Sequence, residues 1–197
     1  MQLKDIFRMK RIFFVFSILF IISCSPKSLG YFEVSPFFKP TIAVIDEPLY
    51  VDFGSKISDD YTISQFGLRT LNVHFFKQSY RYAITQTFND QFKSVEFLAN
   101  ETKGFLLRVY RFEPSWWVGE EKMKIRKEFN DTLRYRDMGC NIKYESTLFY
   151  YNEKVSEAKG EIRNTRDYAT MQTIDDVFKN AVKLSCEDMA KKISDRK

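Results

Sequence analysis

The second half of the chain alternates between apolar and polar positions, the pattern of β-strands that have one buried face. Residues 105–112 place apolar side chains on one side and a more polar set on the other. Residues 142–151 alternate in the same way, and residues 155–163 follow after a polar turn at 152–154. The pattern predicts a strand followed by a β-hairpin.

Two other segments repeat their apolar residues with helical spacing, which predicts helices over residues 79–92 and 173–193. The second segment opens with acidic residues and closes with lysines, the arrangement that favours the helix dipole. Both apolar stripes are expected to face a sheet. The stripes contain Tyr80, Ile84, Phe88 and Phe92 in the first helix and Ile174, Val177, Ala181 and Ile193 in the second.

Shorter segments predict additional extended structure. Residues 41–46 are β-branched and apolar on both faces, as in a strand buried within a sheet. Residues 47–71 are expected to be a long connection that contains one short extended piece at 49–53. Residues 94–98 follow the first helix and are short enough to be a strand.

Pro114 predicts the end of the strand that starts at residue 105, because proline cannot donate a ladder hydrogen bond. This break places Trp116 and Trp117 on a loop at the strand end. The segment 122–137 that follows is less regular. Alternation there favours extended structure, although apolar residues four apart also suit a helix, and we expect extended structure.

The order of these elements predicts an α+β fold. We expect a two-layer sandwich in which two helices pack on one face of a mainly antiparallel sheet. Residues 40–197 are expected to form it as a single domain, which is long enough to bury an adequate core.

The first 25 residues have a different pattern from the rest. Lys10 and Arg11 precede an apolar run at 12–22, which is followed by the small residue Ser23 and by Cys24. An apolar block of about ten residues is shorter than the roughly 20 that span a bilayer as a helix. A basic front, a short apolar block and a small-residue exit are typical of an export signal. The alternative is an ordinary buried helix that happens to end at Cys24.

Residues 21–24, Ile-Ile-Ser-Cys, resemble the lipobox of bacterial lipoproteins. The resemblance implies that residues 1–23 are a signal peptide and that Cys24 is the lipidation site. It also implies stable membrane anchoring, because more than one acyl chain is attached. Residues 24–39 are then expected to be a lipidated, flexible tether. Ser25 replaces the Asp that retains such proteins in the inner membrane, which implies the outer membrane, periplasmic face.

The mature segment has a weaker resemblance to two groups of small periplasmic lipoproteins. These are the auxiliary lipoproteins of ABC-type lipid transporters and the penicillin-binding-protein activator lipoproteins. The similar stretches are TIAVID at 41–46, GFLLRVYRFE at 104–113 and the hairpin sequence at 143–162, followed by the closing helix. The segment 122–137 has no place in that pattern.

The net charge does not indicate a nucleic-acid partner. The whole chain has 31 basic and 26 acidic residues, of which residues 1–23 contain four and one. The mature chain therefore has 27 and 25, close to balance, whereas nucleic-acid binding needs a clustered basic surface.

Two cysteines remain once Cys24 carries lipid. Cys140 and Cys186 are an even pair in an oxidising compartment, so they form either a disulfide or two buried free thiols. The sole histidine, His74, is expected to be a packed or surface imidazole. One His and two thiols are too few for a structural zinc site. We expect no metal, no cofactor and no enzymatic activity.

Trp116 and Trp117 are the candidate interaction residues, because tryptophan is enriched at binding hot spots and membrane interfaces. The alternative is that they cover an open edge of the sheet. The preferred hypothesis is a non-enzymatic lipoprotein that serves as an accessory or docking subunit of an envelope complex for lipid transport or wall synthesis. The other hypotheses are a carrier of lipid or another apolar ligand and a surface-exposed binding lipoprotein.

Overall fold

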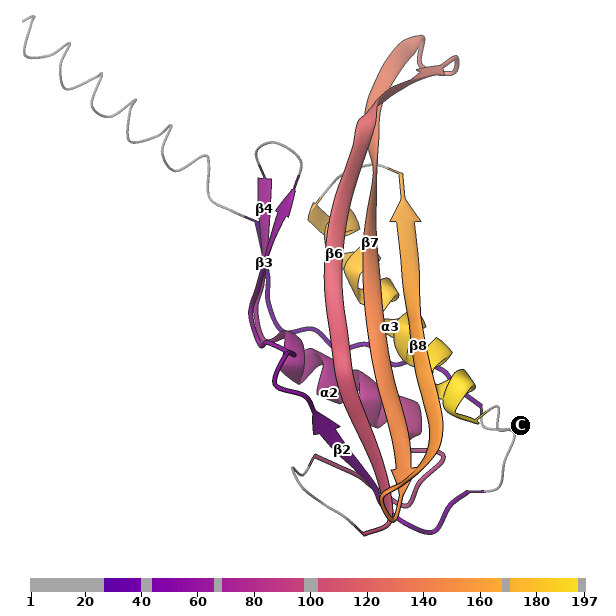
Figure 1. Cartoon of the computed structure of the whole chain (residues 1–197). Helices are drawn as coiled ribbons and strands as arrows, with labels where there is room; N and C mark the ends of the chain where they lie inside the picture. The colour runs from indigo at the N-terminus through magenta and orange to yellow at the C-terminus, as the bar shows by residue number, and fades with distance from the viewer. Residues whose placement is uncertain (1–26, 40–43, 66–68, 98–102, 168–170, 195–197) are drawn as a thin grey trace, which may run out of the picture.

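The structure is a computed structural model that describes residues 27–39, 44–65, 69–97, 103–167 and 171–194 (Figure 1). The expected signal peptide, residues 1–23, and Cys24 lie outside the described residues. The elements are β1 (Lys27–Leu29), β2 (Leu49–Phe53), β3 (Tyr61–Gln65), β4 (Arg69–Val73), α2 (Phe76–Phe88), β5 (Val95–Glu96), β6 (Phe105–Arg126), β7 (Asp131–Tyr150), β8 (Glu153–Arg166) and α3 (Met171–Ser194).

The main sheet has five strands in the order β5-β2-β6-β7-β8. The three long strands β6, β7 and β8 run antiparallel, whereas β2 pairs in parallel with both β5 and β6. Figure 1 shows both helices on the same face of this sheet. The predicted α+β class is confirmed.

A second sheet of three strands, β1-β4-β3, was not expected. β3 and β4 form a hairpin inside the segment 47–71, which was predicted to be a connection with a single extended piece. That extended piece, 49–53, is confirmed as β2 and lies between two other strands.

The prediction of a flexible tether is wrong for residues 27–39. β1 pairs in parallel with β4, and Leu29, Phe32 and Val34 are buried in the core. The Phe32 ring packs edge-on against Phe178 of α3 at a centroid distance of 5.5 Å. These buried apolar side chains hold the segment against the domain, because leaving them in water would cost hydrophobic free energy.

The strand predicted over residues 41–46 is absent from its described part. Val44 is 67% exposed, and Ile45 forms only an isolated parallel bridge with Phe92.

Both predicted helices are confirmed, with shifted ends. α2 begins at Phe76 and ends at Phe88, and its stripe of Tyr80, Ile84 and Phe88 is buried as expected. Phe92 lies beyond the helix but is buried too.

Within the described residues, no helix is long and apolar enough to cross a membrane.

Aromatic rings fill the layer between the helices and the main sheet. Tyr80 of α2 stacks on Phe112 of β6, with ring centroids 3.6 Å apart and an interplanar angle of 17°. Phe76 contacts both Phe112 and Phe178, at 5.6 and 5.8 Å. These contacts fix α2 and α3 against the centre of the sheet.

β6 does not end at Pro114, so the predicted break is wrong. Pro114 lies opposite Ile142 in a pairing with β7 that continues to Arg126. β2 pairs with β6 only as far as Val109, so β6 is an edge strand of the main sheet at Pro114. Edge strands tolerate proline because its missing N–H is not needed on the open side.

Candidate functional site: the projecting β6–β7 arm

The β6–β7 hairpin is longer than the sheet to which it belongs. β8 ends at Arg166, which lies opposite Met138 of β7. Residues 119–137 therefore continue beyond the sheet as a two-stranded ribbon, which we call the arm. Figure 1 shows the arm projecting past the end of β8 and away from the helices. Residues 122–137 are thus extended, as predicted, with a turn at 127–130.

The far part of the arm exposes three large apolar side chains. Met123 is 70% exposed, Ile125 is 73% exposed and Phe129, in the turn, is 68% exposed. Met123 and Ile125 alternate along β6 and so share one face of the ribbon. The guanidinium of Arg126 lies 5.1 Å from the centre of the Phe129 ring. Grouped apolar side chains on a projection indicate a contact surface.

Ion pairs link the two strands in the part of the arm that lies toward the body of the protein. Lys122 pairs with Asp137, and this hydrogen bond holds the pKa of the Asp137 carboxyl below its ordinary value. Glu121 lies 3.6 Å from Arg134 and 3.7 Å from Arg136, on the opposite face. The pairs of Glu121 are exposed and contribute little to stability, whereas the Asp137 side chain is only 16% exposed. Together these pairs link the two strands across both faces.

The two tryptophans lie at the base of the arm, within β6 and not on a loop. Trp116 is 8% exposed and lies opposite Cys140, so its ring belongs to the core. Trp117 is half-buried and covers Gly139 on the opposite face of the sheet. A Cβ atom at Gly139 would lie 2.4 Å from Trp117 Nε1. Of the pair, Trp117 is the more exposed.

Cys140 and Cys186 are both free thiols with no exposed surface. Cys140 belongs to β7 and Cys186 to α3. Burial raises the pKa of each thiol well above its ordinary value. Of the two alternatives that the sequence left open, the structure shows buried thiols.

His74 forms a surface pair with Asp60, whose Oδ1 lies 2.9 Å from His74 Nδ1. The side chains are 45% and 69% exposed, respectively. In the part of the chain that the structure describes, no group of three His, Cys, Asp or Glu side chains is placed to hold a metal ion.

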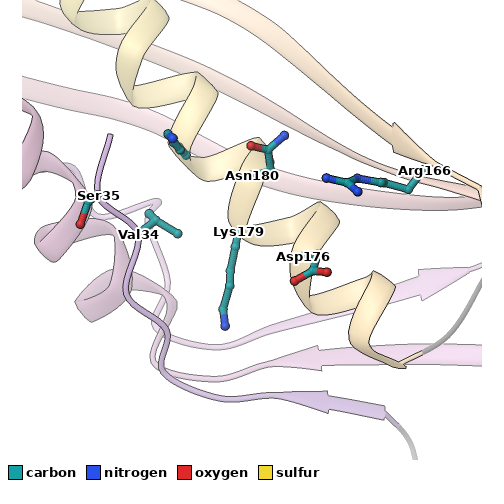
Figure 2. A pocket seen from close by; sticks show the side chains of 7 residues that line it. Val34, Ser35, Arg166, Asp176, Lys179 and Asn180 are labelled. Atoms are coloured by element: carbon teal, nitrogen blue, oxygen red, sulfur yellow. The ribbon is translucent and has the colours of Figure 1, made fainter. Parts of the chain in front are cut away.

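An open cleft of about 430 Å³ lies between α3 and the segment that follows β1. Figure 2 shows Arg166 reaching from the end of β8 toward α3, which carries Asn180 and Lys179. Lys179 Nζ forms an ion pair with Asp175 Oδ2 at 2.6 Å. One lining side chain is apolar and six are polar, a poor lining for the apolar ligand of a carrier. The lining residues are Val34, Ser35, Arg166, Asp176, Lys179, Asn180 and Lys183.

The apolar end of the arm was not identified from the sequence. The alternation of Met123 and Ile125 predicted an extended segment, but alternation alone does not tell a buried face from an exposed one. The available signal was the surrounding charge: the fifteen residues from Lys122 to Arg136 include six cations and two carboxylates, a composition unlike that of a core strand.

No protein-family model and no curated protein matches the chain. Among solved structures, protein XCC0632 from Xanthomonas campestris is similar in fold, with a TM-score of 0.51 at 10% identity over 85% of this chain and 95% of that chain. At that identity the likeness shows a shared fold.

Two other solved structures match with lower scores. A minor lipoprotein from Acinetobacter baumannii has a TM-score of 0.35 at 13% identity, over 77% of this chain and 90% of that chain. An uncharacterized lipoprotein B from Nitrosomonas europaea has a TM-score of 0.41 at 9% identity, over 77% of this chain and 84% of that chain. Likenesses at these scores carry no argument about function.

Proposed function

We propose that this protein is a non-enzymatic lipoprotein, anchored through Cys24, that acts as an accessory subunit of a cell-envelope complex for lipid transport or wall synthesis. The proposed location is the outer membrane, on the periplasmic face. The observation that carries the proposal is the combination of a lipobox-like sequence at residues 21–24 with a folded domain that extends a long arm with exposed apolar side chains.

The proposed mechanism is a tethered search. Lipid on Cys24 confines the domain to one membrane surface, which raises its effective concentration for partners in that membrane. The partner docks at the base of the arm, where Trp117 is half-buried and residues 113–118 form an edge of the main sheet, beyond the hydrogen bond that the Tyr61 hydroxyl donates to the Phe112 carbonyl. An open sheet edge can pair with an extended segment of a partner, and an aromatic ring beside it supplies a hot spot.

Metabolic labelling with a palmitate analogue tests the anchor. The parent chain is expected to incorporate the label and to fractionate with membranes, whereas Cys24→Ala is expected to do neither. An unlabelled parent chain would overturn the proposal.

Site-specific photocrosslinking tests the docking surface. A photoreactive residue at Ser115, which is exposed on the β6 edge strand, is expected to crosslink to an envelope protein in intact cells. The same residue at Glu153, at the start of β8 and at the opposite end of the sheet, is the matched control. The Trp117→Ala variant should weaken the Ser115 crosslink while its far-UV spectrum is unchanged. Equal crosslinking at both positions would contradict docking at the base of the arm.

A further inference from the structure

The exposed end of the arm has no described element packed over it. Met123, Ile125 and Phe129 are each about seven-tenths exposed, and they lie at the far end of a ribbon that the body does not cover. Lys124 and Lys127 lie among these apolar residues. A partner for this surface must accept apolar side chains and cations together.

The chain itself brings one such partner close. Only two residues, Ser25 and Pro26, separate Cys24 from Lys27, where the packed domain begins with β1. The three steps along the chain from Cys24 to Lys27 span about 10 Å at most when fully extended. If Cys24 carries lipid, a bilayer surface therefore lies within that distance of β1.

The arm projects from the same half of the molecule. β1 pairs with β4, and Figure 1 shows β4 and the β3–β4 hairpin in the half toward which the arm extends. The β7–β8 turn lies at the opposite end of the sheet. An anchor next to β1 thus brings the bilayer to the half that carries the arm.

We infer that the end of the arm, with Met123, Ile125 and Phe129, is a second membrane contact that enters the leaflet holding the lipid anchor. This inference rests on the proposed function, because it requires acylation of Cys24. The three apolar side chains enter the boundary between headgroups and acyl chains, as those of interfacial segments do. Lys124 and Lys127 extend their ammonium groups to lipid phosphates, which favours anionic lipids. Two contacts hold the domain in one orientation and leave the base of the arm facing its partner.

A fluorescent probe on the arm tests this directly. The acylated protein, purified from membranes, is reconstituted in vesicles of phosphatidylethanolamine and phosphatidylglycerol. The Ile125→Cys variant is labelled with nitrobenzoxadiazole; Cys140 and Cys186 have no exposed surface and stay unlabelled in the folded protein. The matched control carries the same label at Glu153→Cys.

The label at position 125 is expected to shift to shorter emission wavelengths and to be quenched by nitroxide lipids, with neither effect at position 153. Met123→Ser combined with Phe129→Ser should abolish the quenching at position 125. Lys124→Glu combined with Lys127→Glu, or vesicles of phosphatidylcholine alone, should reduce it.

Two outcomes overturn the inference. The first is a label at position 125 that is as exposed to water as the label at 153, in protein shown to be acylated. The second is a shielded label that nitroxide lipids do not quench, which would indicate a protein contact. Protein without acyl chains would instead refute the proposed function, so the two failures are distinguishable.

Discussion

Gly139 and Trp117 form a matched pair across β6 and β7. The Trp117 ring occupies the space that a side chain at Gly139 would need, since a Cβ atom there would lie 2.4–2.7 Å from three indole atoms. Packing of an aromatic ring over a glycine compensates for the missing side chain in a strand. The glycine therefore fixes the position of the ring at the base of the arm.

Gly139→Ala is expected to lower the free energy of unfolding by about 1–3 kcal/mol, because the indole must move or the strands must separate. In the Trp117→Ala background the same substitution should cost much less, since the space is then empty. Denaturant unfolding of the parent, the two single variants and the double variant gives the coupling energy between positions 117 and 139. Additive effects would contradict the contact.

Buried neutral groups make the fold sensitive to alkaline pH. Burial raises the pKa of the Cys140 and Cys186 thiols. The pKa of Tyr144 is raised by burial and by its hydrogen bond to Asp188, which also accepts one from Lys192 at 2.8 Å. Each group stays neutral in the folded state at a pH where it ionises in the unfolded chain.

Stability is therefore expected to be unaffected by these groups below roughly pH 8.5 and to fall above it, where an unfolded thiol ionises. Above that pH, each thiol should lower the free energy of unfolding by about 1.4 kcal/mol per pH unit. Cys140→Ala should reduce the slope between about pH 9 and 10, which denaturant unfolding across that range would measure. Ala is expected to lower stability equally at all pH values through lost packing, so an unchanged slope would contradict the assignment.

At the scale of elements, the arm extends from β6 and β7 but is not part of the core. Met123, Ile125 and Phe129 are exposed, and the pair of Glu121 with Arg134 lies on the surface. Val118 and Met138, which flank it, lie directly opposite each other. A two-residue Asn-Gly turn is the favoured connection between strands in that arrangement.

Replacement of residues 119–137 by Asn-Gly is expected to change the free energy of unfolding by less than about 1 kcal/mol, as for other surface changes. Leu107→Ala, at a buried position in the centre of β6, should cost about 2–5 kcal/mol in the same assay and serves as the control. A large loss of stability on removal of the arm would show that it supports the domain. The shortened protein should also lose the proposed membrane contact.

The elements that the sequence predicted well are those whose pattern is local. The stripe of α2 repeats every four residues, and the β7–β8 hairpin alternates around a short polar turn. The β3–β4 hairpin was missed, although its two five-residue strands surround Gly67, which is a usable turn signal.

Other features depend on contacts far apart in the chain. Pro114 is compatible with β6 because β2 stops pairing at Val109, and the arm is exposed because β8 stops at Arg166. Neither the end of the β2–β6 pairing nor the end of β8 can be predicted from the sequence of residues 105–137 alone. For the same reason the sequence predicted that the tryptophans act on a loop, whereas Trp116 is part of the core.

At the scale of the whole molecule, the distance along the chain between anchor and fold determines orientation. A segment of about 15 Gly and Ser residues inserted between Pro26 and Lys27 would add a flexible span of roughly 20 Å. Acylation and thermal stability are expected to stay the same, but quenching of the label at position 125 should weaken because the domain is no longer held at the surface.

The same segment inserted into the β7–β8 turn is the control for this variant, and it should leave the quenching intact. Equal quenching in both insertion variants would show that the arm finds the bilayer without help from a short connection.

The packing of β1 and the residues after it also limits how far the protein can be shortened from its amino end. A recombinant chain starting at residue 40 would lack Leu29, Phe32 and Val34, and one backbone edge of β4 would be left open. Open edges next to a depleted core promote aggregation. Preparations for crystallisation or NMR therefore need to start no later than Lys27.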